Sequence, residues 1–182
     1  MNNCFEPLYQ LRGTTVDKCG KDQTGKILYQ INDNGFRDSV NYTQAPDYAF
    51  FGTSTVLGVG IAQENLLVSK FKNAHNYGLA GDYMNSHSMT NLKNFLNSSL
   101  YSTKTKIVFF WIERPGKENL DELITEVNLL GQNILHISQG DKHAGMINLM
   151  PSVDYDVSKT QPGIKSHAIW ARTIKLILEN AR

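Results

Sequence analysis

The segment that most constrains the fold is "TKIVFFWI", residues 105–112. It is an uninterrupted apolar run rich in β-branched and aromatic residues. Such a run is typical of a strand that is buried on both faces, as in a parallel sheet with helices on each side. Shorter candidate strands occur at "DYAFF" (47–51) and "NILHIS" (133–138), and "AHNYGLAGD" (74–82) is expected to give a brief strand that ends in glycines. The chain therefore offers four candidate strands.

Helical patterns separate these strands. The apolar spacing predicts amphipathic helices over residues 62–72, 88–100, 115–131 and 162–182. Ser88 is the expected N-cap of the second helix. The last helix is expected to bury Ala168, Trp170 or Ala171, Ile174 and Leu178. Strands that alternate with helices in this way predict an α/β fold with a parallel sheet covered on both faces.

The chain has 182 residues, a length that suits one compact domain. Hydrophobic residues make up 41% and charged residues 19%, which is enough apolar material for a packed core. Residues 1–46 are the least regular part and are expected to form an N-terminal arm or hairpin. Residues 47–182 are expected to form the α/β domain.

The charge balance excludes two classes of partner. Eighteen basic and 17 acidic residues leave a net charge of +1 without a basic run, so neither nucleic acid nor a membrane surface is expected as a partner.

Cys4 and Cys19 lack metal-site spacing and are expected to be two reduced thiols. The sequence shows no signal peptide and no membrane-length segment, so a cytoplasmic or virion-associated location is expected.

The turn after the first strand carries the strongest candidate for chemistry. Ligands of parallel α/β sheets gather at the carboxyl ends of the strands. Gly52, Thr53, Ser54 and Thr55 lie at such an end. Ser54 can be a nucleophile on a sharp strand-to-helix turn, or the stretch can be only a turn of small residues. A phosphate loop is not supported, because no Gly-Lys-Ser/Thr follows.

Two blocks of sequence resemble the SGNH (GDSL-type) hydrolase family. "NDNGFRD" (32–38) precedes the first strand, and "GTSTVLGVG" (52–60) matches the family's Gly-Asp-Ser block. "NYGLAGD" (76–82) matches the second block. The resemblance implies a three-layer α/β/α sandwich with a flavodoxin-like parallel sheet. It also implies hydrolysis of esters, often acyl groups on carbohydrates or lipids, without a metal or organic cofactor.

The same resemblance assigns roles to particular residues. Ser54 would be the nucleophile, and the N–H groups of Ser54 and Gly81 would stabilise an oxyanion. Several positions depart from the family pattern. Thr53 replaces the block's aspartate, and Glu113 and Arg114 stand where the third block has an asparagine. In the fourth block Gln161 replaces the catalytic histidine and Ser158 its aspartate.

Another group would have to act as the base in an active enzyme, because glutamine has no titratable nitrogen. His167 is the first candidate, with Asp154 or Asp156 to orient it. His143 is the next. The alternative for His167 is that it packs at the start of the last helix. His75, His87 and His136 have weaker positional arguments, and Phe109, Phe110 and Trp111 are expected in the core.

Three hypotheses about function remain open. The first is a serine esterase that acts through Ser54 on a small ester or an acylated carbohydrate. The second is a catalytically silent SGNH-like binding or structural module, for instance a phage virion component, with the N-terminal arm available for assembly with another protein. The third is a flavodoxin-like binder of nucleotides or phosphate. None of them requires a metal, and the first two require no cofactor.

Overall fold

The computed structural model describes most of the chain from residue 29 onward. The described ranges are 29–79, 85–111, 120–130, 134–138, 146–149, 152–155 and 161–180. Cys4 and Cys19 lie outside them. No helix in these ranges is both long enough and apolar enough to cross a membrane.

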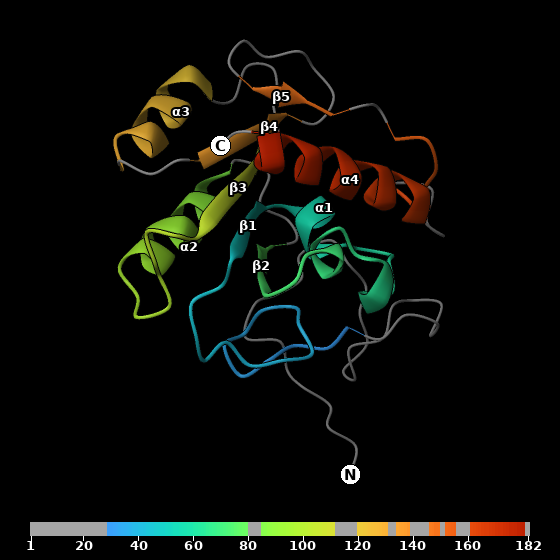
Figure 1. Ribbon diagram of the computed structural model, residues 1–182, viewed down its shortest axis with the longest axis horizontal. Coiled ribbons are helices and arrows are strands. Elements are labelled where there is room, and N and C mark those ends of the chain that lie inside the picture. The colour runs from blue at the N-terminus through green and yellow to red at the C-terminus, as the bar shows by residue number, and fades with distance from the viewer. Residues whose placement is uncertain are drawn as a thin grey trace.

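A five-stranded sheet forms the centre of the molecule (Figure 1). The strands lie in the order β2-β1-β3-β4-β5, and every neighbouring pair is parallel. They are β1 (Tyr48–Gly52), β2 (Ala74–Gly78), β3 (Lys106–Trp111), β4 (Ile134–Ser138) and β5 (Ile147–Asn148). The predicted α/β class is therefore confirmed. The two-residue β5 was not predicted, because so short a strand has no recognisable periodicity.

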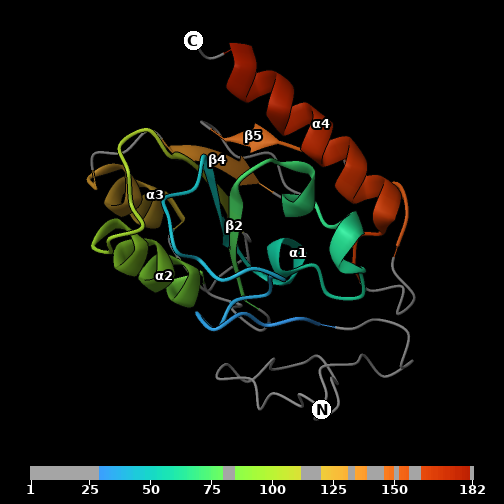
Figure 2. The same ribbon diagram turned by 60° about the horizontal axis from the view of Figure 1, so that its bottom comes forward.

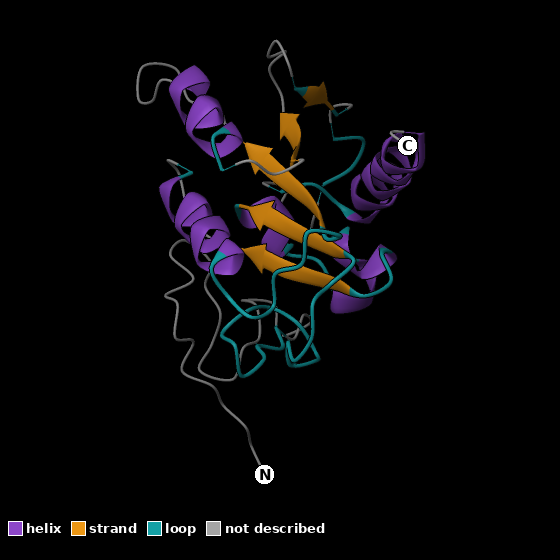
Figure 3. Ribbon diagram, turned by 60° about the vertical axis from the view of Figure 1, so that its left-hand side comes forward, coloured by secondary structure: helices purple, strands orange, loops and turns teal. Residues whose placement is uncertain are grey.

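Alternation along the central strands creates two cores. Phe109 and Trp111 of β3 point into one core, which also contains residues of α2 (Ser86–Leu96) and α3 (Leu120–Asn128). Val108 and Phe110 point into the other, against α4 (Ile164–Asn180). Figure 3 shows helices on both sides of the strands. The apolar run of β3 is continuous because successive side chains point to opposite, equally buried faces.

Two details of the predicted helices are wrong. The helix α2 begins at Ser86, after Asn85, so Ser88 is not its N-cap. Ser88 is fully buried instead, because it lies on the same face of the helix as Leu92 and Phe95. In α4, Trp170, Ala171 and Ile174 are buried and Leu178 packs against them, but Ala168 is exposed.

The predicted helix over residues 62–72 is also wrong. Two short 3₁₀ turns take its place, η1 (Gln63–Asn65) and η2 (Val68–Lys70), with Leu66 extended between them. Leu66, Leu67 and Val68 are all buried. Three consecutive buried residues cannot share one face of a helix, so the chain breaks its helical path to bury each of them.

The described part of the N-terminal segment, residues 29–46, packs beside the edge strand β2. Figures 1 and 2 show it (blue) on that side of the molecule. The Tyr42 ring stacks on His75 at 3.7 Å between ring centres. The Tyr42 hydroxyl accepts a hydrogen bond from the N–H of Asn76 at 2.7 Å. Tyr42 thereby occupies backbone groups that the sheet edge would otherwise expose.

The backbone contact between β2 and α1 (Ser54–Leu57) leads to a testable prediction. A Cβ atom on Gly78 would lie 2.2 Å from the backbone nitrogen of Leu57, where no flexible side chain can move aside. We expect Gly78→Ala to lower the free energy of unfolding by about 2 kcal/mol or more, because this site is overpacked by a single methyl group.

Urea denaturation measures this change. Thr103→Ala, in an exposed turn, is the control and should stay within about 0.5 kcal/mol of the parent. Equal stability of both variants would contradict the close approach of α1 to β2.

Candidate functional site

A sharp turn between β1 and α1 positions Ser54. Gly52 has φ +150°, and a Cβ there would lie 2.8 Å from side-chain atoms of Phe110 and Val56. Glycine therefore suits both the backbone conformation and the available space. Ser54 is the first residue of α1 and is half-buried. Its side chain lies at the carboxyl end of the sheet, where α/β proteins bind ligands.

The residue that meets Ser54 is Gln161. The Ser54 hydroxyl donates a hydrogen bond to Gln161 Oε1 at 3.0 Å, across 107 positions of sequence. The neighbouring Pro162 forms an isolated antiparallel bridge with Tyr155 just before α4 begins. The structure thus brings together the predicted nucleophile and the residue at which the SGNH resemblance would place a histidine. An amide oxygen can accept this hydrogen bond but does not take up the proton near neutral pH.

His167, the predicted substitute base, is engaged elsewhere. Its Nδ1 accepts the backbone N–H of Leu67 at 3.0 Å, and the ring is almost fully buried. With Nδ1 as the acceptor, the neutral ring carries its proton on Nε2. Burial lowers the pKa of His167 to about 4. No hydrogen bond joins it to Ser54 in the described chain, so this arrangement offers Ser54 no lone pair from His167.

Asp154, proposed as the partner of His167, caps helix α4. Its carboxylate accepts the backbone N–H groups of Lys165 at 2.8 Å and Ser166 at 2.7 Å. It also accepts the Ser166 hydroxyl at 2.6 Å. An acidic cap satisfies the free N–H groups of the first turn and complements the helix dipole. These bonds commit Asp154 to the helix start.

Some of the remaining predicted site residues lie in the described part of the chain, and the others lie outside it. Trp111 donates its indole N–H to Nδ1 of buried His136, and Nε2 of that ring lies 3.0 Å from Asn128 Oδ1. His75 is buried against Tyr42, whereas His87 is exposed on α2. Several others lie outside the described residues: Gly81, Glu113, Arg114, His143, Asp156 and Ser158.

Sequence reasoning missed Arg37, which is fully buried against the carboxyl end of α1. Its guanidinium donates to the carbonyl oxygens of Leu57, Gly58 and Ile61. It also lies 4.0 Å from the centre of the Tyr29 ring. Burial lowers the pKa of Arg37 to about 10. The one available signal was the "GFRD" segment, where an arginine stands among turn residues.

No group of three His, Cys, Asp or Glu side chains in the described ranges could hold a metal ion. Comparisons of the chain with protein-family models, with curated proteins and with solved structures found no match. The geometry around Ser54 and the sequence blocks on either side of it are therefore the features that point to a function.

The buried guanidinium of Arg37 leads to a second prediction. Arg37→Met keeps much of the side-chain length but removes the donor from the carbonyl oxygens of Leu57 and Ile61, whereas that of Gly58 keeps the Ile61 N–H at 3.1 Å. We expect a loss of about 3 kcal/mol or more in the free energy of unfolding, since each unsatisfied buried group costs about 1–3 kcal/mol. Arg172→Met, at an exposed arginine of α4, is the matched control for urea denaturation. A small and equal effect in both variants would contradict this role for Arg37.

The buried histidines lead to a third prediction, on pH. Because the pKa of folded His167 is about 4 and the ordinary value is 6.5, the unfolded state binds more protons between these values. The stabilisation is complete above pH 6.5 and is lost as the pH falls toward 4. The contribution of His167 to this loss is roughly 3 kcal/mol.

Urea denaturation from pH 7 to pH 4 tests this dependence. His167→Asn should make the pH profile shallower, because asparagine can still accept the Leu67 N–H but does not titrate. A slope should remain, since burial also lowers the pKa of His75 to about 4. His87→Asn, at an exposed position, should leave the slope unchanged. An unaltered slope in His167→Asn would show that His167 is not the group responsible.

Proposed function

We propose that the chain is an SGNH-like module with a three-layer α/β/α arrangement that binds an acylated ligand at the Ser54 turn without hydrolysing it. The observation that carries the proposal is the hydrogen bond from the Ser54 hydroxyl to Gln161 Oε1. The parallel sheet, the helices on both of its faces and the glycine-dependent turn support the SGNH-like part.

The absence of hydrolysis follows from proton transfer. A serine hydroxyl is a weak nucleophile near neutral pH unless a base removes its proton. Gln161 holds the hydroxyl proton in a hydrogen bond but cannot accept it as a base. His167 is buried, has a pKa of about 4 and uses Nδ1 for Leu67. Neither residue supplies the general base that the chemistry requires.

Binding needs no such base. Ser54 is half-buried at the carboxyl end of β1, so a ligand can reach it. Its N–H belongs to the first turn of α1, where backbone donors have no acceptor within the helix. A carbonyl or hydroxyl oxygen is the natural partner for such donors. A small ester or an acylated carbohydrate presents both kinds of oxygen and is the ligand class that we propose.

One observation favours a second candidate, an active esterase. Ser54 lies on the strand-to-helix turn that serine hydrolases of α/β type use to present their nucleophile. Hydrolysis would then need a base from residues outside the described ranges, such as His143. The two candidates differ in one measurable property, which is turnover that depends on Ser54.

Hydrolysis of p-nitrophenyl acetate separates them. We expect the parent protein and Ser54→Ala to give the same low rate, and a fluorophosphonate probe to leave the intact mass of the parent unchanged. Ser158→Asp/Gln161→His reinstates the base and its orienting carboxylate. We expect it to gain about 100-fold in rate, the lower end of what a general base contributes.

Ser54→Ala in the reinstated background is the control and should remove the gain. Ser54-dependent turnover by the parent protein would favour the esterase and refute the silent module. If the Ser158→Asp/Gln161→His variant folds normally but does not hydrolyse the ester, the missing base is not what prevents hydrolysis in the parent protein.

A further inference from the structure

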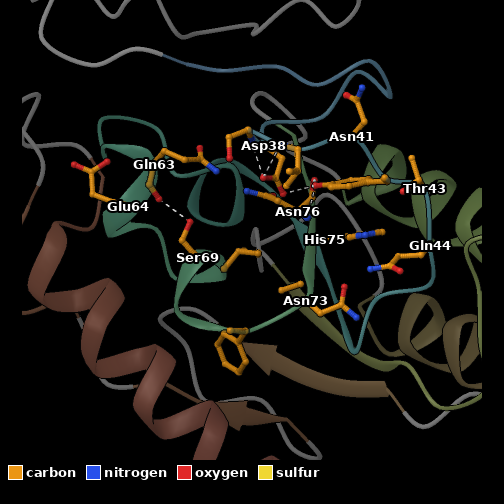
Figure 4. Close-up of a pocket in the computed structure, with 16 residues that line it drawn as sticks. Asp38, Asn41, Thr43, Gln44, Gln63, Glu64, Ser69, Asn73, His75 and Asn76 are labelled. Atoms are coloured by element: carbon orange, nitrogen blue, oxygen red, sulfur yellow. Dashed lines mark hydrogen bonds between the residues drawn. The ribbon is translucent and has the colours of Figure 1, made fainter.

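A polar cavity lies beside the edge strand β2, away from Ser54. Its volume is about 640 Å³, within the roughly 300–1,000 Å³ typical of small-molecule sites. Residues 38–44 of the N-terminal segment line one side, and residues between Gln63 and Asn76 line the other (Figure 4). The cavity follows the amino-terminal half of β2, whereas Ser54 follows the carboxyl end of β1. It is therefore a separate site.

Five side-chain amides line the cavity, and three of them, those of Gln44, Gln63 and Asn73, have unused hydrogen-bonding capacity. Gln44 and Gln63 make no side-chain hydrogen bond to any described residue. The Oε1 atom of Gln63 is buried without a partner in the described chain, so a ligand in the cavity can meet this amide only through Nε2. Asn73 makes only one long contact, to the Ala45 carbonyl oxygen at 3.4 Å. Uncommitted amides offer both donors and acceptors to a ligand.

The charges of the lining exclude an anionic ligand. Asp38 and Glu64 are the charged side chains that line the cavity, and no Lys or Arg is among the described lining residues. Phosphate and carboxylate groups are normally bound by such cations. The Asp38 carboxylate is occupied by the N–H groups of Ser39 and Val40 and by the Tyr42 hydroxyl. Asp38 therefore has little capacity left for a cationic ligand, whereas the exposed Glu64 carboxylate keeps its capacity and is the group that the lysine-rich peptide probes below.

The sheet edge in this cavity is closed to a peptide strand. The Tyr42 hydroxyl accepts the Asn76 N–H and lies 3.2 Å from the carbonyl oxygen of the same residue. The Gly78 N–H is bonded to Asn76 Oδ1 at 2.9 Å. An added strand needs a row of free backbone groups along the edge. These bonds remove that row, so a small ligand fits the cavity better than an extended peptide.

We infer that this cavity binds an uncharged polyhydroxylated ligand, namely a neutral saccharide. Hydroxyl groups both donate and accept hydrogen bonds, and they match amides that also do both. A neutral sugar requires no cation in the lining and leaves no buried charge unpaired. The inference is independent of Ser54, so it stands whether or not the protein hydrolyses esters.

Nuclear magnetic resonance titration of the full chain tests the inference. The probes are maltotriose, cellotriose and N-acetylchitotriose as neutral sugars, trigalacturonate as an anionic sugar, and a lysine-rich peptide. We expect at least one neutral trisaccharide to shift the amide signals of residues 38–44 and 63–76, with trigalacturonate and the peptide binding at least tenfold more weakly.

Gln63→Leu and Gln44→Leu remove the amides at similar side-chain size. Each should weaken sugar binding by about fivefold to tenfold, the effect of losing one or two hydrogen bonds. Gln30→Leu, at an exposed glutamine outside the cavity, should change nothing. The inference is overturned if no neutral sugar binds, if both cavity variants bind like the parent, or if the anionic sugar or the peptide binds better.

Discussion

The buried guanidinium of Arg37 joins the N-terminal segment to the turn that carries Ser54. Burying a cation is costly unless its donors are satisfied. Here the two terminal nitrogens donate to carbonyl oxygens of Leu57, Gly58 and Ile61, while Nε is buried without a partner in the described chain. Carbonyl groups at the end of a helix carry partial negative charge, which suits a guanidinium. The position of α1, and with it the Ser54 side chain, depends on this contact. Arg37 thereby ties the described part of the N-terminal segment to the chain around α1.

The chemistry available at Ser54 depends on which atoms around it donate and which accept hydrogen bonds. Ser54 donates to an amide oxygen, and His167 accepts from a backbone N–H. Neither hydrogen bond requires a proton to move from one residue to another, so Ser54 and His167 serve as stable polar contacts. In the function that we propose, the half-buried Ser54 hydroxyl holds a carbonyl or hydroxyl oxygen of a ligand without reacting with it.

Much of the fold could be predicted from local pattern. The four longer strands and three of the four helices lie where apolar runs and spacing placed them. The failure at residues 62–72 has a physical cause, because Leu67 and Val68 are buried in the core beside α4 whereas Leu66 is buried against Gly58. Periodicity within a segment carries no information about such partners. The pairing of Ser54 with position 161 was predictable only through the SGNH resemblance.

The sequence by itself determined the α/β class, the glycine-rich turn at Ser54 and the absence of a histidine at position 161. These features depend on residue identity and on neighbours within a few positions. Only the tertiary structure decided the engagement of His167 with Leu67, the burial of Arg37 and the cavity beside β2. Each of these depends on groups that are far apart along the chain, and the orientation of a buried side chain is set by the packing and hydrogen bonds it meets after folding.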